Sequence, residues 1–95
     1  MMMSYEIMSS IHERLSHWDE DALWNLIDAV EAELKRAEMF FKASDDVIRF
    51  IAADETGKKV LFTVSVETAH FILFDAEVQL DRFDDDEEFC WKEER

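Results

Sequence analysis

The chain has no proline and a single glycine, Gly57, among its 95 residues. It has one asparagine, Asn25, and one glutamine, Gln79. Catalytic and small-molecule sites usually draw on amide groups and on glycine-shaped loops for binding and turning. Because both are scarce, the composition argues against an enzyme and favours a binding protein. The only cysteine, Cys90, has no partner for an intramolecular disulfide.

Long hydrophobic runs are also missing. No apolar stretch approaches the roughly 18 residues that a bilayer-spanning helix needs. The first residues, M-M-M-S-Y-E-I-M, lack the basic region and apolar stretch of a secretory signal. We therefore predict a soluble, cytoplasmic protein.

Acidic residues greatly outnumber basic residues in the sequence. Twenty-four Asp and Glu residues face ten Lys and Arg residues, which gives a net charge of −14. Hydrophobic residues still make up 48% of the chain, with eight Phe and three Trp, so a packed core is expected rather than a disordered acidic chain. A charge of this size repels nucleic acid and anionic membranes, and it favours a basic protein as the partner.

Two helices are predicted in the first half. The spacing of Ser10 and Glu13 fits a capping box and predicts a short helix from Ile11 to about Ser16, after an N-terminal strand or arm. Asp19 is a suitable N-cap for a long helix that ends near Ala43. Its apolar residues recur at spacings of three and four, which is one helix face: Leu23, Ile27, Val30, Leu34, Ala37 and Phe41.

A β-hairpin is predicted next. Residues 47–53 and 59–66 are rich in β-forming residues, and the second run alternates apolar and polar side chains. Gly57 lies between them, where a short hairpin loop favours a left-handed residue. Residues 69–83 fit helical spacing, with additional antiparallel strands as the alternative.

These elements give an α+β fold in a single small domain, residues 1–95, in the order helix, helix, β-hairpin, helix, with an acidic C-terminal segment at residues 84–95. A lone hairpin must rest its apolar face on the helices to be stable. Its open edge could pair with a second copy, so a homodimer is a further expectation.

No metal, cofactor or catalytic residue is predicted. His12 and His17 are five residues apart and do not share a helix face. Cys90 lies among carboxylates, which disfavour the reactive thiolate. The acidic stretches lack the alternating acids, central glycine and final glutamate of a calcium-binding loop.

The predicted binding surface is acidic. From Ser65 to Arg95, eleven Asp and Glu residues face three basic residues. Five of these carboxylates are consecutive, and aromatic residues flank them, as in interfaces that use aromatic anchors. The predicted partner-binding residues are Glu67, Asp75, Glu77, Asp81, Asp84, Asp85, Asp86, Glu87, Glu88, Phe89 and Trp91.

The predicted function is a non-enzymatic inhibitor that blocks a basic, nucleic-acid-binding protein by imitating a polyanion. Phage anti-defence proteins, immunity proteins and antitoxins have a similar size and composition. The alternative is an acidic dimeric adaptor or chaperone that holds a partner segment in an apolar groove. The candidates for that groove are Trp18, Trp24, Met39 and Phe40.

Overall fold

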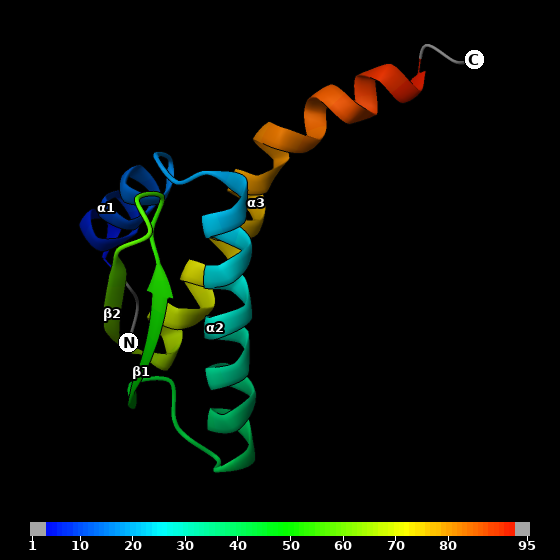
Figure 1. Ribbon diagram of the computed structural model, residues 1–95. Coiled ribbons are helices and arrows are strands. Elements are labelled where there is room, and N and C mark those ends of the chain that lie inside the picture. The colour runs from blue at the N-terminus through cyan, green and yellow to red at the C-terminus, as the bar shows by residue number, and fades with distance from the viewer. Residues whose placement is uncertain (1–3, 93–95) are drawn as a thin grey trace.

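The chain forms an α+β structure in the predicted order of helix, helix, hairpin and helix. The computed structural model describes the backbone of residues 4–92 and the side chains of residues 4–83. The hairpin lies beside α2, and α3 passes behind both (Figure 1). The alternative prediction of additional strands over residues 69–83 is wrong, because helix α3 spans these residues. The elements are α1 (Tyr5–Leu15), α2 (Glu20–Met39), β1 (Val47–Ala53), β2 (Lys59–Ser65) and α3 (Val66–Lys92).

The first helix is longer than predicted. It begins at Tyr5, because the side chain of Ser4 accepts a hydrogen bond from the Ile7 backbone N–H at 3.2 Å. The predicted capping box at Ser10 is therefore wrong, and Ser10 lies within the helix. Ile11 packs against the core and Leu15 is buried in it, so α1 covers part of the core.

The start of α2 is confirmed and its end is not. Asp19 caps the helix by accepting a hydrogen bond from the Ala22 N–H at 2.9 Å. The helix ends at Met39, not near Ala43. Lys42 N–H donates to the Ala37 carbonyl and Phe41 N–H donates to the Glu38 carbonyl. This pair of bonds is a Schellman motif, which normally places glycine at the left-handed position.

Phe41 occupies that left-handed position with φ of 56°, and its side chain is almost fully exposed. A left-handed conformation costs a non-glycine residue about 1 kcal/mol. We therefore expect Phe41→Gly to raise the free energy of unfolding by about 0.5–1 kcal/mol. Urea unfolding followed by circular dichroism measures this change. Exposed Phe40, the C-cap residue, is the control, because Phe40→Gly relieves no left-handed strain.

The hairpin is confirmed, with its turn where Gly57 predicts it. Gly57 has φ of 85°, and Asp54 organises the turn by accepting hydrogen bonds from Thr56 and Lys58. The Thr56 side chain first, and then the two backbone N–H groups, hold the pKa of Asp54 below its ordinary value. The strands pair antiparallel, with Phe50 opposite Phe62. Their rings stack on the inner face at 4.9 Å between centroids.

The core lies between the inner face of the hairpin and the three helices. Leu23, Leu26 and Val30 of α2 are fully buried, and so is Ala69 of α3. Trp18, a candidate for a partner groove, is also buried in this core, so that prediction is wrong. Within residues 4–92, no helix is long and apolar enough to cross a bilayer.

Helix α3 runs antiparallel to α2 and packs along it. At its start, the Ser65 hydroxyl accepts a hydrogen bond from the Thr68 N–H at 3.1 Å, and the Val66 N–H donates to the carbonyl of Asp46, in the loop that joins α2 to β1. Further along, the Arg82 guanidinium donates to the carbonyls of Ser16 and Trp18, just before α2 begins. These bonds fix which turns of the two helices lie at the same level.

Candidate functional site: an acidic face of two helices

Asp75 was predicted to face solvent and bind a partner, and this prediction is wrong. Its side chain is buried, with 4% of its surface exposed. One carboxylate oxygen lies 2.8 Å from Nδ1 of His12, and the other accepts from the Gln79 amide at 3.4 Å. The same amide donates to the His12 carbonyl at 3.2 Å. Asp75 therefore ties α1 to α3 and is not available to a partner.

Helix α2 carries a row of exposed, mainly acidic side chains along its outer side. Neighbouring members are three or four residues apart, so they share one helix face. Every member is exposed, and Trp24 leaves 51% of its surface open. The row consists of Asp21, Trp24, Asp28, Glu31, Lys35 and Glu38.

Helix α3 carries a second row at the same spacing. Phe74 is its aromatic member and leaves 61% of its surface exposed. Glu67 is half-buried, and the other members are exposed. The row consists of Glu67, His70, Phe74, Glu77 and Asp81.

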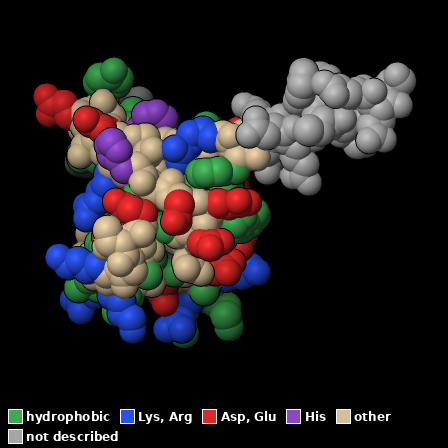
Figure 2. Space-filling view, turned by 45° about the horizontal axis from the view of Figure 1, so that its top comes forward, with side chains coloured by type: hydrophobic (Ala, Val, Ile, Leu, Met, Phe, Trp, Pro, Cys, Tyr) green, Lys and Arg blue, Asp and Glu red, His purple; other side chains and the backbone are tan. Residues whose placement is uncertain are grey.

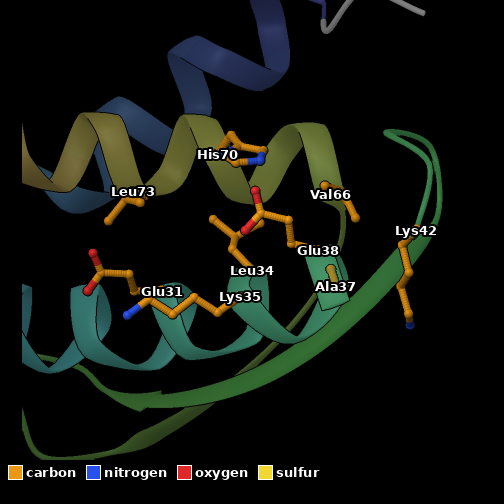
Figure 3. A pocket seen from close by; sticks show the side chains of 9 residues that line it. All are labelled: Glu31, Leu34, Lys35, Ala37, Glu38, Lys42, Val66, His70 and Leu73. Atoms are coloured by element: carbon orange, nitrogen blue, oxygen red, sulfur yellow. The ribbon is translucent and has the colours of Figure 1, made fainter. Parts of the chain in front are cut away.

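A groove between α2 and α3 joins the two rows. Glu31, Lys35 and Glu38 line it from α2, Lys42 lines it from just beyond the end of that helix, and His70 lines it from α3. Figure 3 shows the carboxylates of Glu31 and Glu38 directed from α2 toward α3, with the His70 ring above Glu38. The floor is apolar, formed by Leu34, Ala37, Val66 and Leu73. Because α2 and α3 pack side by side and His70 meets the α2 row at this groove, we treat the two rows as one surface, which we call the acidic helical face.

The acidic helical face has a charge density close to that of one strand of a nucleic acid. Its two rows hold seven carboxylates and a single lysine, Lys35. At 1.5 Å per residue, Asp21 and Glu38 are about 25 Å apart along α2, which gives roughly one carboxylate per 4 Å of face. A single DNA strand carries about one phosphate per 3.4 Å. Exposed Trp24 and Phe74 add flat apolar groups to this charge.

Charge is also segregated over the surface of the molecule. Figure 2 shows Asp and Glu side chains gathered in the middle of the face it draws. Lys and Arg side chains lie along the left, lower and right margins of the same view, and a further group lies just above the acidic side chains. Acidic side chains are therefore gathered on part of this face rather than spread evenly over it.

Three of the predicted partner-binding residues lie on this face, namely Glu67, Glu77 and Asp81. The side chains of residues 84–91, predicted to belong to the same surface, lie outside the described side chains. The contribution of α2 to this face was not predicted. The available signal was the spacing of Asp21, Asp28, Glu31 and Glu38, opposite the apolar stripe of that helix.

Metal-ligating side chains do not converge among residues 4–83, where no three His, Cys, Asp or Glu residues form a group that could hold an ion. The His12 ring, which the sequence offered as a possible ligand, instead contacts the side chains of Asp75 and Gln79.

The chain matches no protein-family model, no curated protein and no solved structure. The acidic helical face is therefore the feature from which a function can be inferred.

Proposed function

We propose that this protein is a non-enzymatic inhibitor that presents its acidic helical face to a basic, nucleic-acid-binding protein and covers the site where that partner binds phosphates. The observation that carries the proposal is the alignment of seven exposed or half-exposed carboxylates in two adjacent helical rows. A row of fixed charges costs less entropy to bind than a flexible acidic chain, because α2 and α3 already hold it in place.

The aromatic members of the face supply binding energy that charge alone does not. Binding by opposite charges speeds association and selects basic partners, but exposed ion pairs contribute about 0–1 kcal/mol each. Trp24 and Phe74 each expose a ring beside the carboxylates and can bury it in the partner. Tryptophan is enriched among the residues that dominate binding energy, and Arg stacks well on aromatic rings.

The test compares how strongly two tagged proteins capture partners from a cell lysate, namely the unaltered chain and a face variant. The face variant carries Asp28→Asn, Glu31→Gln, Glu77→Gln and Asp81→Asn. A matched control carries the same number of neutralisations at exposed positions off the face: Glu6→Gln, Glu13→Gln, Asp45→Asn and Glu55→Gln. We expect the face variant to bind the captured protein about 10- to 100-fold more weakly, and the control to bind within about twofold.

Two further readouts decide whether the captured protein is of the proposed class. Duplex DNA added to the complex should displace the chain, and the complex should weaken steeply between low and high salt. Equal losses in the face variant and the control would show that only net charge matters, and would contradict a defined face. A captured protein that binds DNA and the chain simultaneously would contradict the inhibitory role.

An adaptor that holds a partner segment is the second candidate function. The observation that favours it is the apolar floor of the α2–α3 groove, together with exposed Met39 and Phe40 at the end of α2. A partner held there would bind with nearly the same affinity at low and high salt. It would also be lost on substitution of Leu73 by Ser, which removes part of the floor without changing charge.

A further inference from the structure

The outer face of the hairpin differs in charge from the rest of the molecule. Neither β1 nor β2 contains an Asp or Glu, and their only charged residues are Arg49 and Lys59. Both are exposed, whereas the turn that joins the strands holds Asp54 and Glu55 as well as Lys58. In a chain with a net charge of −14, this is a locally basic surface.

The same face is apolar at its centre. Ile51 and Leu61 lie directly opposite each other on the paired strands, and they leave 57% and 61% of their surfaces exposed. Their neighbours Ile48 and Phe50 point the other way, into the core. Exposed apolar residues in a group mark interaction sites more often than isolated ones do. We call this surface the hairpin outer face; it consists of Val47, Arg49, Ile51, Lys59, Leu61 and Thr63.

The C-terminal segment of the chain has the complementary composition. Asp84 to Glu88 supply five consecutive carboxylates, and Phe89 and Trp91 follow them at once. The carboxylates are opposite in charge to Arg49 and Lys59. The aromatic residues are apolar, like the exposed pair Ile51 and Leu61.

A second copy is the occupant that the backbone favours. Helix α3 continues to Lys92, and its ribbon leads away from the hairpin (Figure 1). The hairpin outer face also lies on the far side of the sheet from the core that α3 packs against. A continuous helix cannot turn back around the sheet to reach the outer face of its own hairpin.

We propose that residues 84–92 of one copy dock on the hairpin outer face of a second copy, and that the exchange is reciprocal. Two identical contacts related by a two-fold axis close the assembly as a dimer. The contact also brings opposite charges together, which offsets part of the repulsion between two strongly acidic chains. This inference is independent of the proposed inhibitory function, because it uses neither row of the acidic helical face.

Sedimentation equilibrium of full-length variants tests the assembly at about physiological salt. We expect the unaltered chain to sediment at twice its 11.3 kDa mass. Neutralising residues 84–88 to Asn and Gln should give a monomer, and so should the double variant Arg49→Glu, Lys59→Glu. The matched control is Lys35→Glu, Arg36→Glu, which changes net charge equally on exposed positions of α2 and should remain a dimer.

Cys90 allows the position of the segment to be read directly, because it is the only cysteine in the chain. A photo-crosslinker on Cys90, in a mixture of ordinary and ¹⁵N-labelled copies, should form crosslinks between copies that map to residues 47–63. Circular dichroism of each variant establishes that it is folded. A monomeric unaltered chain, a dimer that survives either altered contact, or crosslinks confined to one copy or to α2 would each overturn the proposal.

Discussion

Replacing Asp75 with Ala is expected to lower the free energy of unfolding by about 2–3 kcal/mol, because it removes a buried, hydrogen-bonded carboxylate. The substitution removes the acceptor for His12 and for the Gln79 amide. Gln79 is itself buried, and its amide would then keep only its contacts with His12. Urea unfolding at pH 7 followed by circular dichroism measures the change.

Asp81→Ala is the matched control for this prediction. Asp81 belongs to the same helix, but its side chain is exposed. Its removal should change the free energy of unfolding by less than about 0.5 kcal/mol. Partner capture should show the reverse order, because Asp81 lies on the acidic helical face and Asp75 does not. Similar losses of stability in the two variants would contradict a structural role for Asp75.

The error over Asp75 has a specific physical origin. A helix that packs on one neighbour shows a single apolar stripe, and Asp75 lies outside the stripe of α3. Helix α3, however, also contacts α1, and this second contact buries Asp75 and Gln79. Although His12 lay within the predicted helix, its contact with Asp75 was not predictable, because it depends on how α1 packs against α3. A polar residue buried by a distant helix leaves no local signal in its own helix.

Features governed by short-range rules were predictable. Gly57 and the alternation of residues 59–65 located the hairpin, and Asp19 located the start of α2. The end of α2 was not predictable in the same way, because Phe41 takes a left-handed conformation that is usually left to glycine. The acidic helical face was half predicted. Its α3 row followed from the local excess of acid, whereas joining that row to the α2 row required knowing that the two helices pack side by side.

Leu26→Ala is expected to destabilise the chain by about 2–5 kcal/mol, because it leaves a cavity in a fully buried part of α2. A domain of this size has a free energy of unfolding of about 5–15 kcal/mol, so the variant approaches the limit of folding. Its urea midpoint, measured by circular dichroism, should fall more than that of any surface variant. An unchanged midpoint would show that the core does not depend on α2 as the structure indicates.

Trp24 lies two residues before Leu26, and its substitution should separate binding from folding. Half of the Trp24 surface is already exposed, so Trp24→Ala should lower the free energy of unfolding by no more than about 1 kcal/mol. If the ring is the anchor of the acidic helical face, the same change should weaken partner binding by about 30-fold, the loss typical of a binding hot spot. Titration of the captured partner by calorimetry measures this loss. Full affinity in Trp24→Ala would leave charge alone as the basis of recognition and would remove the aromatic anchor from the proposed mechanism.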